Sequence, residues 1–240
     1  MLIAVELGGS SRQTCVFLHD EAALLVDGGS VVSPGARYGL AAPGVIRDGR
    51  LYYAANLDIP DRTTLRDAGG LPAAPEVGVN DAIAQAAGEW YLRRSGNPPR
   101  DLFYVGIGTG VGSARVVDGA RVEPTNLGHT PGWSQTTCPG CGNVGCLDTV
   151  ISGRVLPTPL SEQDQQFVAR TLAQALERHG VGDESCVVLA GGLVKRNPEM
   201  LTRLNEIRGS RVEPTAAPAA FKSSAPYGLL AIWRGALTAP

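Results

Sequence analysis

Three cysteines and one histidine, gathered between positions 129 and 146, constrain this chain more than any other feature. His129 is followed by Cys138, Cys141 and Cys146 within the run C-P-G-C-G-N-V-G-C-L-D. Thiolate and imidazole are ligands of tetrahedral zinc, and the glycines between the cysteines allow the tight turns that a metal-binding loop requires. Because these four side chains would fill all four coordination positions, no position would remain for water, and the predicted zinc is structural.

A redox-active C-x-x-C pair and a DNA-binding ribbon are the two alternatives to a zinc site at these cysteines. The first lacks a helix start at the cysteines, and the second lacks basic surroundings. The chain has 21 Lys and Arg against 23 Asp and Glu, so nucleic acid and anionic membrane surfaces are disfavoured as partners. It begins directly with a strand-like run and has no apolar run of membrane-spanning length, so we expect a cytoplasmic protein with reduced cysteines.

The run V-G-I-G-T-G-V-G at 105–112 indicates a strand that enters a glycine-rich turn. Without Cβ atoms, Gly108, Gly110 and Gly112 let backbone N–H groups approach an anion, as in loops that bind phosphate. The same plan recurs at 2–9, where L-I-A-V-E-L-G-G is followed by a second strand-like run. This repetition predicts two lobes of similar build, each presenting a glycine hairpin to a shared cleft. Two unrelated hairpins are the plainer alternative.

Asn80 and Asp81 stand where a short strand is expected to pass into a helix. The partial positive charge of a helix N-terminus stabilises a carboxylate, so we expect Asp81 to stay ionised at neutral pH. A charged and well-placed carboxylate can accept a proton from a hydroxyl group. The alternative is a plain helix N-cap, which is the usual role of Asn and Asp at such a junction. On spacing alone, the cap is favoured.

The later part of the chain predicts further elements. Ser161-x-x-Asp164 indicates a capping box for a helix that continues to His179. The run C-V-V-L-A-G-G at 186–192 predicts a buried strand that ends in glycines, against which a flat ring or a ribose can lie. A plain turn into a helix is the alternative. The Pro-, Ala- and Ser-rich segment 208–226 is expected to be an exposed loop, and the apolar segment after it a docked helix.

Taken in order, these motifs resemble the ROK family (repressors, open reading frames and kinases), which contains bacterial glucokinases and related sugar kinases. The shared motifs are G-G-S near the N-terminus, N-D before a helix, G-T-G-V-G, G-H with the cysteine cluster, and a late L-A-G-G. The resemblance covers nearly the whole chain, and G-H…C-G-x-x-G-C is its most specific part. It implies an α/β fold of the two-lobed, actin-like ATPase (ribonuclease H-like) type with a small zinc-tied loop.

The resemblance also implies a division of the chain and a function. Residues 1–79 with 227–240 would form a small N-terminal lobe, and residues 80–226 a larger lobe with the zinc loop 129–148. The implied reaction is ATP-dependent phosphoryl transfer to a hydroxyl of a hexose-like sugar. Its cofactors would be ATP, Mg²⁺ and a structural Zn²⁺. The partner would be a small-molecule sugar, with neither nucleic acid nor membrane, and a homodimer is one assembly open to such a chain.

Site residues follow by matching motifs position by position. Asp81 matches the catalytic base. The residues that match sugar contacts are Asn56, Asn80, Asn126, His129 and Asp148. Those that match cofactor-binding loops are Glu6, Gly8, Gly9, Ser10, Gly108, Thr109, Gly110, Gly191 and Gly192. Those that match zinc ligands are His129, Cys138, Cys141 and Cys146.

The chain departs from the family at several positions. Glu6 stands where the family has aspartate, and Asn126 stands where it has a glutamate, so one acid is longer and another has lost its charge. One extra residue separates Cys138 from Cys141, and a helix expected between residues 27 and 37 is missing. These departures leave two alternatives, a non-catalytic sugar-binding or sensor protein and a kinase with a different phosphoryl donor. A repressor is disfavoured because no helix-turn-helix precedes the first strand.

Overall fold

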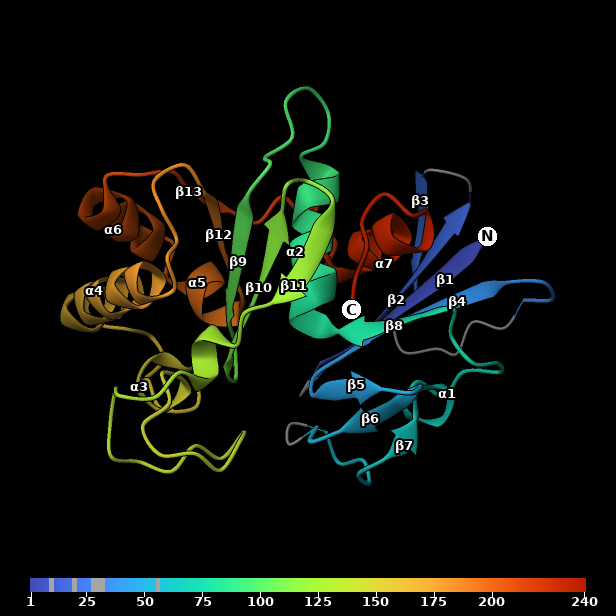
Figure 1. Cartoon of the computed structure of the whole chain (residues 1–240), viewed down its shortest axis with the longest axis horizontal. Helices are drawn as coiled ribbons and strands as arrows, with labels where there is room; N and C mark the ends of the chain where they lie inside the picture. The colour runs from blue at the N-terminus through green and yellow to red at the C-terminus, as the bar shows by residue number, and fades with distance from the viewer. Residues whose placement is uncertain (9–10, 19–20, 27–32, 55–56) are drawn as a thin grey trace. The chain divides into compact units, whose positions relative to one another are not determined.

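The computed structural model describes residues 1–8, 11–18, 21–26, 33–54 and 57–240 of the chain. Contacts between residues divide it into two compact units (Figure 1). The first contains residues 1–98, 120–122 and 216–240, and the second contains residues 99–119 and 123–215. Each unit is built around its own β-sheet.

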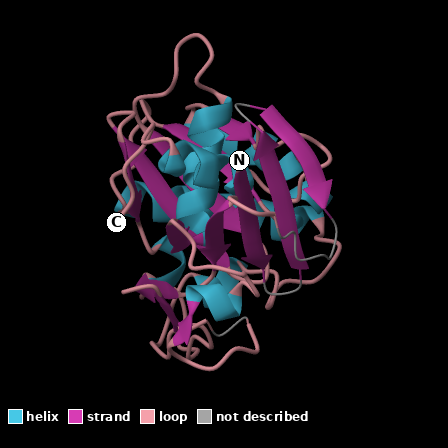
Figure 2. Cartoon of the chain, turned by 90° about the vertical axis from the view of Figure 1, so that its right-hand side faces the viewer, coloured by secondary structure: helices cyan, strands magenta, loops and turns pink. Residues whose placement is uncertain are grey.

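The first unit contains a five-stranded sheet in the order β3-β2-β1-β4-β8, whose strands lie side by side in Figure 2. Its strands are β1 (Leu2–Gly8), β2 (Ser11–Leu18), β3 (Glu21–Val26), β4 (Arg37–Ala42) and β8 (Val77–Asn80). Strand β1 pairs antiparallel with β2 and parallel with β4, and β4 pairs parallel with β8. A small sheet follows β4, made of β5 (Val45–Arg47), β6 (Arg50–Tyr52) and β7 (Thr63–Thr64), and leads into the short helix α1 (Leu65–Ala68).

Two helices of the first unit, α2 (Asp81–Leu92) and α7 (Ala225–Trp233), pack against each other and against the large sheet. Glycines permit this close approach. A Cβ atom on Gly88 would overlap the Ser224 backbone, and one on Gly228 would overlap the Ala84 carbonyl. Other apolar side chains of β1 and β4 form a separate core with α1 and β6. The junction of β8 and α2 is therefore held between well-packed elements.

The second unit contains a five-stranded sheet in the order β11-β10-β9-β12-β13. Its strands are β9 (Leu102–Ile107), β10 (Val111–Val117), β11 (Arg121–Pro124), β12 (Cys186–Ala190) and β13 (Val212–Pro214). Its helices are η1 (Leu127–His129), α3 (Asp148–Ile151), α4 (Glu162–Arg178), α5 (Gly192–Arg196) and α6 (Glu199–Arg208). The predicted capping box is confirmed, because Ser161 and Asp164 exchange hydrogen bonds at the start of α4. The buried face of α4 packs on the sheet core and on α6.

The two sheets share one plan. In each, a central strand pairs antiparallel with the next strand along the chain and parallel with a later one, β1 with β2 and β4, or β9 with β10 and β12. A last parallel strand, β8 or β13, completes the edge. The internal duplication predicted from the two glycine hairpins is therefore confirmed at the level of strand order.

Several details differ from the sequence expectations. The turn signals Pro34-Gly35, Pro43-Gly44 and Asp48-Gly49 predict that residues 34–60 are loop-rich with short strands, and this segment contributes β4, which is almost entirely buried beside β1. Residues 80–98 and 216–226, expected in the larger lobe, belong to the first compact unit because α2 packs on α7. The helix expected to be missing would include residues 27–32, which lie outside the described residues. Among the described residues, the helices are too short or too polar to cross a bilayer.

Candidate active site and metal centre

The carboxyl edge of the first sheet gathers acidic and amide side chains. Glu6 lies near the end of β1, and Asn80 is the last residue of β8. Parallel strands such as β1, β4 and β8 place their carboxyl ends at the same edge of a sheet, where ligands of open α/β sheets usually bind. The sheet therefore brings Glu6 towards the junction where α2 begins.

Asn80 is the N-cap of α2. Its side-chain oxygen accepts a hydrogen bond from the Ala82 amide at 2.9 Å, and its side-chain nitrogen donates to the Gly44 carbonyl at 3.0 Å. Asp81 is the first helical residue, and its Oδ1 accepts from the same Ala82 amide at 2.9 Å. Because Asn80 supplies the cap, Asp81 is available for a role beyond capping.

Burial controls the charge of Asp81. It raises the pKa of this carboxyl to about 6, against the opposing effect of hydrogen bonds from the backbone amides of Ala82 and of Asp81 itself. The stabilisation expected from the helix N-terminus is thus outweighed, although the carboxyl is still mostly ionised at neutral pH. A carboxylate with a pKa just below the working pH is well suited to accept a proton.

Glu6 is buried and held by three donors. Its Oε1 accepts from Gln85 Nε2 at 2.8 Å, and its Oε2 accepts from Ser223 Oγ at 2.6 Å and from Gln13 Nε2 at 3.4 Å. All three donors are neutral, so none of them brings a positive charge to the carboxylate. The carboxylate has about four lone-pair sites, of which these contacts use three.

The surroundings of Glu6 raise its pKa to about 7. Burial is the main cause, and the negative charge of Asp81 adds to it. The hydrogen bonds from Ser223 and Gln85 lower the pKa, as does the charge of Lys222, but by less. Near neutral pH the edge of the first sheet therefore holds one carboxyl that is mostly ionised and one that is about half protonated.

Two of these partners were missed by sequence reasoning. Gln85 follows Asp81 by four residues and so lies on the same face of α2, which the helical spacing could have indicated. Ser223 belongs to the segment expected to be an exposed loop, and nothing local marks it as a partner of β1. Three predicted site residues, Gly9, Ser10 and Asn56, lie outside the described residues. Gly8, also predicted, ends β1.

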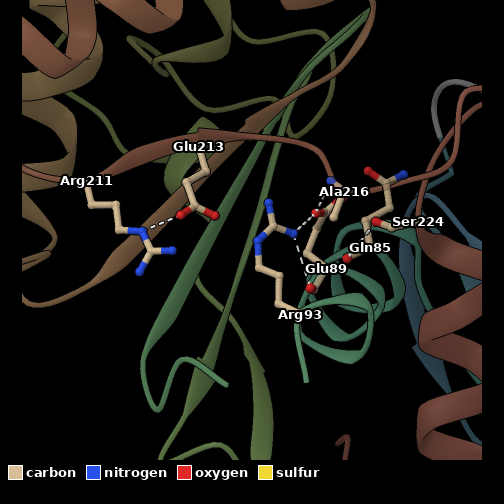
Figure 3. Close-up of polar contacts among 7 residues, drawn as sticks. All are labelled: Gln85, Glu89, Arg93, Arg211, Glu213, Ala216 and Ser224. Carbon is tan, nitrogen blue, oxygen red and sulfur yellow. Dashed lines mark hydrogen bonds and ion pairs between the residues drawn. The ribbon is translucent and has the colours of Figure 1, made fainter. Parts of the chain in front are cut away.

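A buried ion pair fixes the segment that precedes Ser223 to helix α2 (Figure 3). Glu89 is fully buried and accepts hydrogen bonds from Arg93 and, at 2.8 Å, from the Ala216 amide. Further along, Ser224 Oγ donates to the Gln85 carbonyl at 2.9 Å. These bonds bring residues 216–224 along α2, and so deliver Ser223 to Glu6.

The carboxyl edge of the second sheet gathers two of the predicted cofactor loops. Gly108, Thr109 and Gly110 form the turn between β9 and β10, in which the Gly108 amide donates to the Gly110 carbonyl at 2.9 Å. Gly191 follows β12, the parallel neighbour of β9, and a Cβ atom there would lie 2.7 Å from the Ile107 nitrogen. With a φ of +101°, Gly191 also has a backbone conformation that favours glycine.

The predicted zinc ligands converge. The ligand atoms of His129, Cys138, Cys141 and Cys146 all lie within 4.8 Å of one another. The Cys138 sulfur is 3.6 Å from His129 Nδ1, and the Cys141 and Cys146 sulfurs are 3.5 Å apart. Ligands about 2.3 Å from a tetrahedral ion are about 3.8 Å from one another, so the four atoms fit a closed zinc site.

Tight turns shape this cluster. The Cys138 amide donates to the Asn143 carbonyl at 2.7 Å, and the Gly142 amide donates back to the Cys138 carbonyl at 2.8 Å. Burial raises the pKa of the Cys141 thiol, but hydrogen bonds from Asn143 and the neighbouring thiols outweigh it and lower this pKa. Burial and the neighbouring thiols raise the pKa of Cys146 to about 12, so of these two thiols Cys141 loses its proton first. The extra residue between the first two cysteines is accommodated within this turn.

The last two predicted residues have contrasting environments. Asn126 is exposed and has a left-handed backbone with φ of 53°, which asparagine tolerates, at the start of η1. Asp148 is 3% exposed, and its Oδ1 accepts from the Val111 amide at 2.7 Å while Arg154 lies 3.3 Å from its Oδ2. The side chain of Asp148 is thus directed at the glycine turn within its own unit.

The sequence matches the model of one protein family, described as the ROK family, over residues 10–189. This chain belongs to the ROK family. It is 32% identical over 180 residues to the N-acetylmannosamine kinase of Citrobacter koseri, an alignment that covers 70% of this chain and 58% of that relative. The chain thus spans less than two thirds of the length of that relative.

Solved structures show the same fold. A ROK family glucokinase from Streptomyces griseus in complex with glucose and AMPPNP has a TM-score of 0.68 at 18% identity, covering 95% of this chain and 97% of its own. An inorganic polyphosphate/ATP-glucomannokinase from Arthrobacter sp. strain KM has a TM-score of 0.68 at 21% identity, covering 95% and 96%. The expected α/β, actin-like fold of this ROK protein is therefore confirmed.

Proposed function

We propose that this ROK protein transfers the terminal phosphoryl group of ATP to a hydroxyl of a hexose-like sugar, with Asp81 as the general base. The observation that carries the proposal is the placement of Asp81, which follows a dedicated N-cap and has a pKa of about 6. Membership of the family and the similarity to an N-acetylmannosamine kinase support the class of reaction.

In the proposed reaction the Asp81 carboxylate accepts the proton of the sugar hydroxyl. The sugar oxygen forms a bond to the terminal phosphorus, the bond from that phosphorus to the bridging oxygen breaks, and ADP leaves with its electron pair. Positioning and electrostatics supply most of the rate in such transfers. Mg²⁺, when bound, would neutralise phosphate charge, and Glu6 offers the oxygen ligand that this ion prefers, with one lone-pair site left.

The donor contacts are assigned to glycine loops. The Gly108–Gly110 turn offers backbone amides to phosphate oxygens, and Gly191 and Gly192 leave a backbone surface for the adenosine. Gly8 and its neighbours Gly9 and Ser10 are proposed as the corresponding phosphate loop of the first unit.

The sugar contacts are assigned to amide and imidazole groups, Asn56, Asn80, Asn126 and His129. The geometry supports a definite role for His129, because Nδ1 faces the cysteine cluster at 3.6 Å from Cys138. A neutral imidazole that binds metal through Nδ1 carries its proton on Nε2, so Nε2 can donate to a sugar hydroxyl. Asn126 offers an uncharged amide where the resemblance to the family implies a glutamate, and we therefore expect a sugar preference of its own.

The test is an assay of ADP release with ATP, Mg²⁺ and a panel of sugars that includes N-acetylmannosamine, glucose and mannose. Replacement of Asp81→Asn is expected to lower kcat by about a hundredfold or more while sugar affinity is kept. In the parent, kcat/KM should fall below a pH of about 6, where Asp81 becomes protonated. Glu199→Gln is the matched control, because it removes an exposed acid from the first turn of α6. Full activity of Asp81→Asn would refute the assignment.

The same assay separates two alternatives to an ATP-dependent sugar kinase. The similarity in fold to a polyphosphate/ATP-glucomannokinase makes polyphosphate the second donor to test. The uncharged Asn126 and the largely engaged Glu6 favour a non-catalytic sugar sensor as the other candidate. A sugar that raises the melting temperature without ADP or phosphate release would support the sensor, since a ligand that binds only the folded state stabilises it.

A further inference from the structure

Residues 148–154 hold the glycine turn between β9 and β10 at two points, and we call this segment the clasp. The Asp148 Oδ1 accepts from the Val111 amide at 2.7 Å, just past the turn. The Gly153 amide donates to the Gly108 carbonyl at 2.8 Å, at its start. Both ends of the turn are therefore fixed by one short segment of the second unit.

The fit between the clasp and the turn is close. A Cβ atom on Gly110 would lie 2.8 Å from Asp148 Oδ1, and one on Gly153 would lie 2.6 Å from the Gly108 carbonyl oxygen. Asp148 itself is 3% exposed. Glycine is therefore required at these two positions for the contact itself, in addition to any need of the bound ligand.

The charge of Asp148 has to be compensated where it lies. A buried carboxylate beside a turn that binds phosphate would repel the phosphate, and the repulsion is strong where water is excluded. Arg154 lies 3.3 Å from Asp148 Oδ2, from the other end of the clasp. The pair therefore places an acceptor against the Val111 amide without leaving net negative charge near the turn.

We infer that Asp148 is a positioning residue for the phosphoryl donor, setting the backbone of the Gly108–Gly110 turn, and is not a sugar contact. Arg154 is its neutralising partner. The resemblance to the family places Asp148 where a sugar-binding glutamate stands, but its Oδ1 accepts from the Val111 amide and its Oδ2 lies beside Arg154. The inference rests on the proposed function, in that this turn binds the phosphates of a nucleotide or polyphosphate.

The test measures binding of the donor and of the sugar separately, on the full zinc-loaded chain. The probes are Mg·ADP and magnesium tripolyphosphate by calorimetry, and N-acetylmannosamine and glucose by their effect on the melting temperature. Asp148→Ala leaves the Val111 amide without its acceptor, so the Kd for the donor probe should rise about tenfold or more while the sugar effect is unchanged. Asp148→Asn keeps an oxygen acceptor and should stay within about threefold of the parent.

The charge argument is tested by Arg154→Ala. It leaves the Asp148 carboxylate unpaired, and the Kd for Mg·ADP should rise about tenfold. In the double variant D148N/R154A the charge is gone, and the Kd should return to within about threefold of the parent. A purely structural role would not produce this rescue of affinity in variants that are all folded at the assay temperature.

Asp148→Glu provides the opposite test. Because Gly110 leaves no space for another methylene, the glutamate should weaken donor binding. If it instead strengthens the sugar effect and leaves the donor Kd unchanged, Asp148 is a sugar residue and the inference is wrong. If the parent binds the donor probe and Asp148→Ala binds it equally well, the inference is wrong but the proposed function stands. A parent chain that binds neither donor probe would overturn both.

Discussion

Replacement of Glu6→Gln should change how the stability of the first unit depends on pH. The pKa of Glu6 rises from 4.5 to about 7 in the folded chain, chiefly through burial. A difference of one unit between the folded and unfolded pKa is worth about 1.4 kcal/mol, so the folded state favours the protonated form of Glu6 by about 3 kcal/mol. Because the folded pKa is above the unfolded one, this stability is complete below a pH of about 4.5 and is lost as the pH rises through 7.

Most of this loss falls in an accessible range. Between pH 5 and pH 8, Glu6 should remove about 2–3 kcal/mol from the free energy of unfolding, and the glutamine variant should lack that component. Glutamine resembles the protonated acid, and Gln85 can turn its amide so that its oxygen accepts from the new side chain. The variant should therefore be the more stable protein at pH 8.

The assay is urea denaturation followed by tryptophan fluorescence. In a Trp133→Phe background the remaining reporters, Trp90 and Trp233, both belong to the first unit. Asp81→Asn is a useful comparison, since the pKa of Asp81 rises only to about 6 and its share of the loss between pH 5 and pH 8 should be about 1 kcal/mol. If the parent and the Glu6→Gln variant lose stability in parallel from pH 5 to pH 8, Glu6 titrates normally and the argument from burial is wrong.

Two further predictions concern the metal and the buried ion pair. Cys146→Ser removes one of four ligands, so bound zinc measured by atomic absorption and the melting temperature should both fall, whereas Cys186→Ala should keep its zinc. Glu89→Ala leaves Arg93 without its buried partner and should lower the free energy of unfolding by about 3–5 kcal/mol. The control is Arg211→Ala, which breaks an exposed pair and should cost less than about 1 kcal/mol; equal losses in the two variants would contradict the argument.

The features that sequence predicted well are set by neighbours along the chain. The capping box of α4 depends on residues three positions apart, and the antiparallel pairs β1–β2 and β9–β10 join strands that follow each other directly along the chain. The convergence of His129 with the three cysteines follows from a short loop that can close in few ways. In each case the residues that form the pattern contact one another within about twenty positions, so interactions between sequence neighbours decide the outcome.

The features that sequence reasoning missed depend on contacts between distant segments. Ser223 reaches Glu6 across more than two hundred positions, and the segment 208–226 that contains Ser223 carries no pattern that predicts this contact. The helix N-terminus is expected to stabilise the ionised form of Asp81, but burial in the folded chain raises the pKa of this carboxyl to about 6. For Asp148, the residue type and the motif predicted a site residue, but the direction of its side chain depends on the glycine turn beside it.

The first unit is built from segments that lie far apart in the sequence, and this has a consequence for synthesis on the ribosome. Helix α7 and Ser223 lie in residues 216–240, so the unit that contains Glu6 and Asp81 cannot complete its core until that stretch has been translated. The second unit needs only residues 99–215, apart from a short stretch at 120–122 that groups with the first. During synthesis the unit with the His-Cys cluster is therefore the first able to finish folding, and the unit that holds Asp81, the proposed catalytic base, must wait with an open apolar face.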